Sequence, residues 1–120
     1  MLKKKYRLKK YSAVLATYRV NNVVFDKNIC VYFGKKKTDE SIPVKIAFVV
    51  SKKIHKRAVV RNRIKRLMRE NFRLILKNND FPFINDYMSI ICVAKKGSLE
   101  ADYQSISSSL NKILPGFNSQ

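Results

Sequence analysis

The chain has 120 residues, of which 46% are hydrophobic, so it can bury one core but is too short for two independent ones. No apolar run approaches the roughly 20 residues needed to cross a bilayer, so we expect no transmembrane helix. The 26 Lys and Arg side chains against eight Asp and Glu give a net charge of +18, typical of proteins that bind a polyanion. We therefore expect one folded domain, residues 1–120, that binds nucleic acid and no membrane.

The positive charge is concentrated in the first two thirds of the chain. Residues 1–77 carry 23 basic and four acidic side chains, whereas residues 78–120 carry three and four. Residues 1–10 form a basic leader, which we expect to be mobile at its start. Because no apolar segment of a secretion signal follows this leader, we expect a cytoplasmic protein.

The first half of the chain predicts a helix and two or three strands. Tyr11, Val14, Leu15 and Tyr18 recur at helical spacing, and Asn21-Asn22 breaks that pattern. The β-branched and aromatic run over 23–33 predicts a strand, with room for it to be broken into two. A second strand is expected over 44–50. We expect these strands to pair antiparallel, with the polar residues 35–41 as a solvated hairpin tip.

The second half predicts helix, strand and helix. Apolar residues over 58–77 follow the 3.6-residue period, and the polar residues 78–80 end that helix. Residues 87–94 predict a buried strand. Ser98 is the expected N-cap of the last helix, which Pro115-Gly116 should stop. The resulting fold class is α+β, with helices over a small mixed central sheet.

The two cysteines, Cys30 and Cys92, each lie inside an apolar run. Neither has a second Cys or a His at metal-ligand spacing. We therefore expect two small buried core residues, with no disulfide.

The helix over 58–77 and the loop before it are strongly basic. Eleven basic residues lie between Lys52 and Lys77, and Glu70 alone opposes them. Six fall at steps of four residues and so form a ridge that winds around the helix: Arg57, Arg61, Lys65, Arg69, Arg73 and Lys77. A merely solvated face would mix both signs of charge, so we interpret this ridge as a phosphate-binding surface. Helix and charge alone leave DNA and RNA open.

The same region resembles the signature of a known family. Its residues are Val49-Val50-Ser51-Lys52-Lys53-Ile54 and, after a short basic spacer, Arg61-Asn62-Arg63-Ile64-Lys65-Arg66-Leu67-Met68-Arg69-Glu70. Together they are similar to the signature of the bacterial ribonuclease P protein component. The basic entry over 7–10 and Ala94-Lys95-Lys96-Gly97 extend the resemblance to nearly the whole chain.

The resemblance implies a fold and a function. The fold has α-β-β-β-α-β-α order, and the signature helix joins two parallel strands by a left-handed crossover, against the usual right-handed preference. The function is that of a subunit of ribonuclease P, the ribonucleoprotein endonuclease that removes the 5′ leader of precursor tRNA. The resemblance implies that magnesium ions on the RNA subunit perform the chemistry and that the polypeptide binds no cofactor. The implied partners are ribonuclease P RNA and precursor tRNA, with no obligate protein partner.

Two groups of site residues follow from the resemblance. The RNA-subunit-binding residues are Lys52, Lys53, Arg57, Arg61, Asn62, Arg63, Lys65, Arg66 and Arg69. The precursor leader is expected in a cleft between the first helix and the sheet, at Val14, Tyr18 and Tyr32. Aromatic side chains suit this role because they stack on unpaired bases of any sequence. Val14 stands where the family commonly has an aromatic residue.

Two other functions remain as alternatives. A ribosomal or ribosome-assembly RNA-binding protein would explain the charge equally well, although not the detailed signature. A protein nuclease would need converging carboxylates for a two-metal site. The eight acidic residues form no such motif, and His55, the single histidine, is expected to be a solvated loop residue. We therefore expect no catalytic and no metal-binding residue in the polypeptide.

Overall fold

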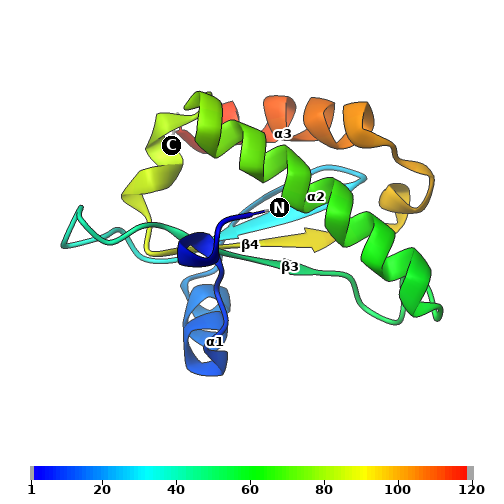
Figure 1. Cartoon of the computed structure of the whole chain (residues 1–120), viewed down its shortest axis with the longest axis horizontal. Helices are drawn as coiled ribbons and strands as arrows, with labels where there is room; N and C mark the ends of the chain where they lie inside the picture. The colour runs from blue at the N-terminus through cyan, green and yellow to red at the C-terminus, as the bar shows by residue number, and fades with distance from the viewer. Residues whose placement is uncertain (1, 119–120) are drawn as a thin grey trace.

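A four-stranded sheet with the order β1-β2-β4-β3 forms the centre of the molecule (Figure 1). The computed structural model describes residues 2–118 and their side chains through Phe117. The elements are η1 (Lys4–Tyr6), α1 (Tyr11–Val20), β1 (Asn22–Phe25), β2 (Ile29–Phe33), β3 (Lys45–Val49), α2 (Ala58–Asn78), η2 (Pro82–Asp86), β4 (Ser89–Ala94), η3 (Lys96–Glu100) and α3 (Tyr103–Asn118). Helices α2 and α3 cover one face of the sheet, and α1 lies on the other (Figure 1). The α+β class and the α-β-β-β-α-β-α order are confirmed.

The strand expected over 23–33 is two strands joined by a tight turn. β1 and β2 pair antiparallel, with Phe25 opposite Cys30. The Asp26 carboxylate accepts the backbone N–H groups of Asn28 and Ile29 at 2.8 and 3.0 Å, which shapes the turn. Burial alone would raise the pKa of Asp26, but these bonds, together with one from Ser109, hold it below its ordinary value.

The expected antiparallel pairing between the first two predicted strands is wrong. β4 lies between β2 and β3, antiparallel to β2 and parallel to β3. Residues 35–41 are therefore part of a connection between two strands that do not pair with each other, and they are no hairpin tip. A run of apolar residues indicates how deeply a strand is buried, but not which strand it pairs with. α2 joins the parallel strands β3 and β4. That this crossover connection is left-handed stays an expectation.

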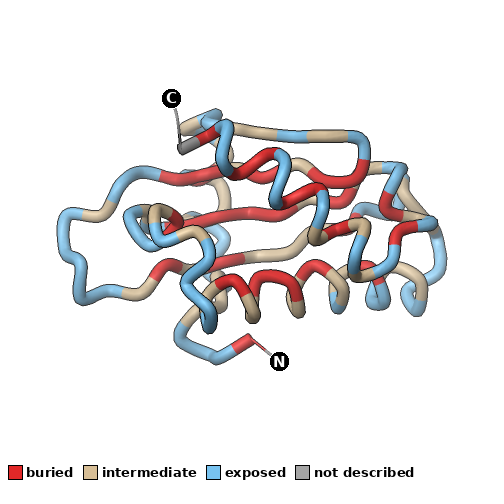
Figure 2. The backbone as a smooth tube through the Cα atoms, turned by 90° about the horizontal axis from the view of Figure 1, so that it is seen from above, coloured by how far each residue is buried: buried red, intermediate tan, exposed pale blue. Residues whose placement is uncertain are grey.

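The core lies between the sheet and helices α2 and α3. Ile29, Val31 and Phe33 of β2 point into it, alternating with half-buried residues on the other face. From α2, the buried side chains are Ile64, Met68, Asn71, Phe72 and Ile75. Figure 2 shows the resulting pattern, in which buried stretches line the inner sides of strands and helices.

The two cysteines occupy opposite faces of the sheet, and both are free thiols. Cys92 is fully buried in the core, and this burial raises the pKa of its thiol. The expectation of a buried core residue is thus confirmed for Cys92. It is wrong for Cys30, which is half-buried on the face that α1 only partly covers.

The last helix begins and ends later than the sequence predicts. Asp102 is its cap, because the Asp102 carboxylate accepts the N–H of Ser105 at 2.9 Å, whereas Ser98 lies in η3. The helix also continues past Pro115 to Asn118. Phe117 stacks on Phe33 with ring centroids 4.0 Å apart, and this packing offsets the cost of a proline inside a helix.

The basic N-terminal segment packs against the rest of the domain. Leu2 is 2% exposed and belongs to the core. The Leu8 N–H donates to the Ile46 carbonyl at 3.0 Å, so the segment extends the β3 edge of the sheet. The expected mobility at the start of residues 1–10 stays a prediction, and Met1 lies outside the described residues.

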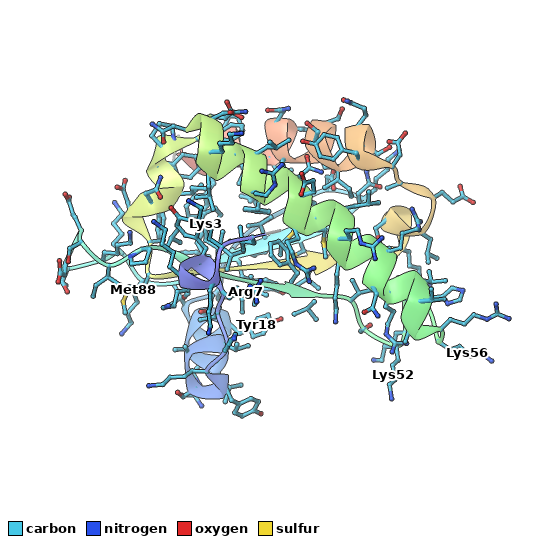
Figure 3. The ribbon with its side chains drawn as sticks, in the orientation of Figure 1. Lys3, Arg7, Tyr18, Lys52, Lys56 and Met88 are labelled. Atoms are coloured by element: carbon cyan, nitrogen blue, oxygen red, sulfur yellow. The ribbon has the colours of Figure 1, made fainter. Side chains whose placement is uncertain are left out.

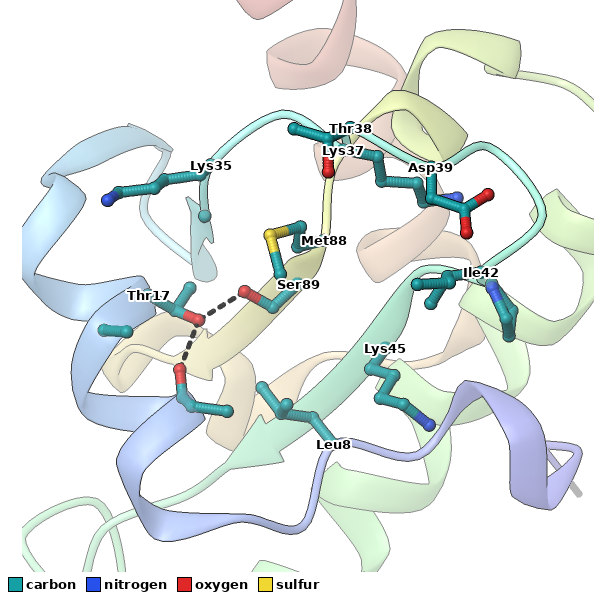
Figure 4. Close-up of a pocket in the computed structure, with 14 residues that line it drawn as sticks. Leu8, Thr17, Lys35, Lys37, Thr38, Asp39, Ile42, Lys45, Met88 and Ser89 are labelled. Carbon is teal, nitrogen blue, oxygen red and sulfur yellow. Dashed lines mark hydrogen bonds between the residues drawn. The ribbon is translucent and has the colours of Figure 1, made fainter.

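A buried hydroxyl pair fixes α1 to the sheet. The Thr17 hydroxyl donates to the Ala13 carbonyl at 2.8 Å and pairs with the Ser89 hydroxyl of β4 (Figure 4). Since the single Thr17 proton is used within the helix, Ser89 is the donor to Thr17. Gly34 makes room for this pair, because a Cβ at Gly34 would clash with the Ser89 hydroxyl.

We expect Thr17→Val to lower the free energy of unfolding by about 1–3 kcal/mol, since it leaves the buried Ser89 hydroxyl without its acceptor. Urea unfolding measures the loss. Adding Ser89→Ala should restore much of it, because the unpaired donor is then gone. Strictly additive losses in this double-mutant cycle would mean that the two hydroxyls are not coupled.

Candidate RNA-binding surfaces

The buried side of α2 determines where its basic residues lie. Ile64, Met68 and Phe72 recur every four residues and face the sheet. Asn62 and Arg66 lie on the outer side and are exposed. Lys52 and Lys56 extend the charge beyond the start of the helix (Figure 3). The helix thus presents a cationic outer surface along its length.

Lys65 and Arg69 take part in a groove that the sequence analysis did not predict. They line a hollow of about 320 Å³ together with Arg7 and Lys9 of the N-terminal segment. A neighbouring hollow of about 480 Å³ adds Lys3, Arg73 and Lys77. The N-terminal segment and α2 therefore form one basic groove, which we define by these seven side chains. The positive charge of the N-terminal segment was visible in the sequence, but the position of this segment beside α2 was not.

Within residues 2–117, the structure shows a single ion pair, between Arg73 and Glu70. The hydrogen bonds from Arg73 lower the pKa of the Glu70 carboxyl, which stays ionised at neutral pH. Glu70 thus neutralises one arginine. The other cations of α2 have no carboxylate partner in this part of the chain, as expected for a surface that binds phosphate.

Arg61 and Arg63 differ from the other signature residues because they bind backbone carbonyls of this chain. Arg61 donates to the carbonyls of His55 and Lys56 at 3.1 and 2.6 Å. Arg63 lies two positions on, about 200° around the helix, and donates to Leu99 and Ala101 at 3.0 and 3.4 Å. Both arginines therefore fasten α2 to neighbouring segments, whatever else they contact.

The loop before α2 carries the remaining expected RNA contacts. Lys52, Lys53 and Arg57 are exposed. His55 lies in this loop as expected but is half-buried, and its Nδ1 accepts the Arg57 N–H at 3.1 Å. His55 thus helps to shape the turn into α2.

The structure brings Tyr18 and Tyr32 together beneath the sheet. Their ring centroids lie 4.8 Å apart, with the rings at 73°, and both side chains are half-buried. Val14 lies one helical turn before Tyr18 and is also half-buried. All three predicted leader-binding residues therefore lie on the same flank of α1.

Beside this flank, part of the sheet is open. We define the open face as Phe25, Cys30, Val93 and Val49, which lie in register across β1, β2, β4 and β3. One row closer to α1, Ile91 is fully buried, whereas Val93 and Val49 are half-buried and Phe25 is exposed. In the described chain, no helix covers the right-hand part of the lower face in Figure 1. α1 therefore shields only part of this side of the sheet.

The thiol of Cys30 and the phenols of Tyr18 and Tyr32 are uncharged at neutral pH. Burial raises the pKa of the Cys30 thiol. Burial and, to a lesser degree, the charge of a Cys30 thiolate raise the pKa of the Tyr18 phenol. The charge of a Cys30 thiolate and, to a lesser degree, burial raise the pKa of Tyr32. Neutral phenols suit a surface for unpaired bases, because a phenolate would repel the adjoining phosphates.

A hollow of about 290 Å³ lies on the opposite flank of α1 (Figure 4). Leu8, Ile42 and Met88 line it, and the last two are 50% and 54% exposed. Lys35, Lys37 and Lys45 lie at its margin. The sequence analysis did not predict this hollow, because its walls come from four separate segments.

The acidic side chains are dispersed. No group of three or more His, Cys, Asp or Glu side chains converges within the part of the chain that the structure describes. The expectation that the polypeptide holds no catalytic or metal-binding residue stays a prediction. Over the same residues, no helix is long and apolar enough to cross a membrane.

Comparison with known proteins agrees with the fold. The family model Ribonuclease P matches residues 2–117. The ribonuclease P protein component of Clostridium kluyveri is 33% identical over 112 residues, with 91% of each chain covered. That of Fusobacterium nucleatum is 37% identical over 110 residues, covering 88% of this chain and 91% of the relative.

Solved structures agree as well. A Staphylococcus aureus ribonuclease P protein mutant, described as defective in mRNA degradation activity, superposes with a TM-score of 0.75 at 27% identity, covering 96% of this chain and 90% of that one. The Thermotoga maritima protein, solved with 1-(4-fluorophenyl)-2-thiourea, has 21% identity and a TM-score of 0.69, covering 88% and 94%, and shows the same fold. These comparisons do not favour the ribosomal alternative. The chain belongs to the ribonuclease P protein family and is a subunit of the endoribonuclease that matures the 5′ end of tRNA.

Proposed function

We propose that the chain serves ribonuclease P through two separate surfaces, one for the RNA subunit and one for the precursor's leader. The observation that supports this most strongly is their separation by the sheet. The cationic surface lies along α2, and the uncharged Tyr18–Tyr32 pair lies on the opposite face, beside α1. A duplex-rich RNA offers mainly phosphates, whereas a single-stranded leader offers bases.

The RNA subunit binds the α2 surface and the basic groove. Lys52, Lys53, Arg57, Asn62 and Arg66 are exposed and face solvent. Lys65 and Arg69 act within the groove, next to Arg7 and Lys9. Arg61 and Arg63 contribute charge while holding α2 to its neighbours. Arginine suits this role because its planar guanidinium can bind two phosphate oxygens at once.

The leader of precursor tRNA lies along the open face, between α1 and the end of β3. Tyr18 and Tyr32 stack on its bases, and Val14 supplies apolar contact. The polypeptide performs no chemistry itself. It works in the cytoplasm with ribonuclease P RNA, whose bound magnesium ions cleave the precursor, and it needs no protein partner.

We expect the protein to restore 5′-leader removal by a bacterial ribonuclease P RNA at low magnesium, because its cations take over part of the neutralisation of RNA phosphates. Gel analysis of cleaved precursor measures the effect. The protein freed of RNA should cleave nothing. Cleavage by the polypeptide alone would contradict a non-catalytic role.

We expect Arg66→Ala to reduce the slope of log affinity against log salt for the RNA subunit by about 0.7 to 0.9, the value for one phosphate contact. Its stability should change by less than about 0.5 kcal/mol, since Arg66 is exposed. Arg63→Ala is the matched comparison. It should also cost about 1 kcal/mol of unfolding free energy through the lost bonds to Leu99 and Ala101. Equal melting curves for both variants would show that Arg63 does not fasten α2.

We expect Tyr18→Ala and Tyr32→Ala to weaken holoenzyme binding of leader-bearing precursor about 5- to 150-fold, and to leave mature tRNA nearly unaffected. Stacking on one base contributes about 1–3 kcal/mol, and mature tRNA has no leader to stack. Tyr→Phe at either position is the control, because it keeps the aromatic ring. Equal losses for both substrates would assign these tyrosines to the fold or to the RNA-subunit contact.

A further inference from the structure

We propose that Phe25 and Lys95 form an outer nucleotide subsite at the β1 edge of the open face. This subsite would bind one more unpaired base of the leader, farther from the cleavage site than the bases at Tyr18 and Tyr32. The inference rests on the proposed function of the open face. It concerns two residues that the family signature helix and the Tyr18–Tyr32 pair do not include.

The strand register places Phe25 on the same face as the two tyrosines. Phe25 is opposite Cys30, and Val23 is opposite Tyr32. Phe25 and Tyr32 are thus diagonal neighbours, whose Cα atoms in such a sheet lie roughly 7–8 Å apart, within reach of aromatic side chains. A strand bound across this face could therefore pass from one ring to the other without leaving the protein.

Phe25 contributes little to the core. In β1, Val24 packs against the buried cluster, and Phe25 points to the opposite side and is 62% exposed. Single exposed apolar residues are common on protein surfaces and by themselves indicate nothing. Here the exposed ring continues a row of half-buried residues from Val49 through Val93 and Cys30. It also has a cation beside it.

Lys95 supplies that cation. Its Nζ lies 4.6 Å from the centroid of the Phe25 ring, and its backbone N–H donates to the Asn28 carbonyl at 2.9 Å, which holds the residue at the end of β4. An aromatic ring next to an ammonium group matches the two parts of a nucleotide. The ring can stack on the base, and the ammonium can bind the phosphate.

The position of the subsite determines when a leader reaches it. The basic groove and the α2 surface lie at the β3 edge of the sheet, through Arg7 and Lys65, whereas β1 is the opposite edge. An RNA subunit bound along α2 delivers the leader from the β3 side. The leader therefore meets the Tyr18–Tyr32 pair first and Phe25 last, so occupation of the subsite requires a longer leader.

Precursor tRNAs whose leaders increase one nucleotide at a time test the proposal. Holoenzyme affinity is measured for the native chain and for Phe25→Ala. We expect no difference for short leaders and, beyond a threshold length, a loss of about 5- to 150-fold for the variant, the value of one stacked base. The threshold should exceed the length at which Tyr18→Ala and Tyr32→Ala first weaken binding. A loss that is independent of leader length, or no loss at any length, would overturn the subsite.

Matched variants separate stacking from other effects. Phe25→Tyr should bind like the native chain, whereas Phe25→Leu, which keeps apolar bulk without an aromatic face, should lose affinity. Lys95→Ala should reduce the salt slope by about 0.7, for one phosphate of a single strand, and only with long leaders. Thermal melting of each variant should match the native chain, because neither side chain belongs to the core cluster.

A precursor with an abasic nucleotide at the threshold position gives the sharpest outcome. It should bind the native chain as weakly as the intact precursor binds Phe25→Ala, and the two changes together should cost no more than either alone. Additive losses would show that Phe25 does not touch that base. If the tyrosine variants bind every leader normally, the proposed function of the open face fails. If they lose leader binding while Phe25→Ala does not, the outer subsite alone fails.

Discussion

The position of β4 is the constraint on which the rest of the structure depends. It pairs with β2 on one side and β3 on the other, and its side chains are buried on both faces. One face packs into the core beneath α2, and the other carries Ser89, which holds α1 through Thr17. Because one strand anchors both layers, the cationic helix and the aromatic flank of α1 remain on opposite sides of the sheet. The surfaces proposed for the RNA subunit and for the leader therefore share no residues.

Most of the basic side chains around this sheet have no acidic partner within the described residues. The net charge of +18 places like charges close together, which destabilises the free protein and favours binding to a polyanion. The N-terminal segment intensifies this effect, because its pairing with Ile46 brings Arg7 and Lys9 next to Lys65 and Arg69. Arg61 and Arg63 moderate it, since each donates to backbone carbonyls. The basic surface is thus partly structural, and its residues are not interchangeable.

The helices were the most predictable part of this protein, since a 3.6-residue apolar pattern directly describes the buried face of α2. Capping residues and prolines predicted the ends of the helices less reliably. Ser98 was the expected N-cap of the last helix, but Asp102 caps α3. The stacking of Phe117 on Phe33 lets α3 continue through Pro115. Of the candidate site, Tyr18 and Tyr32 could be placed on one side of α1 from periodicity and resemblance. Their contact with each other, and the row from Val49 to Phe25, depend on strand register, which alternation within one strand does not encode.

By itself, the sequence determined the composition of the surfaces: the cationic outer side of α2, the tyrosines beside α1, and a family signature specific enough to indicate the function. Only the tertiary structure decided which segments meet. It placed β4 between β2 and β3, the N-terminal segment beside Lys65, and Phe25 next to Lys95. The physical reason is that helix periodicity, charge and capping act over a few neighbouring residues. Strand order and groove walls instead depend on the burial of surfaces contributed by residues far apart in the chain.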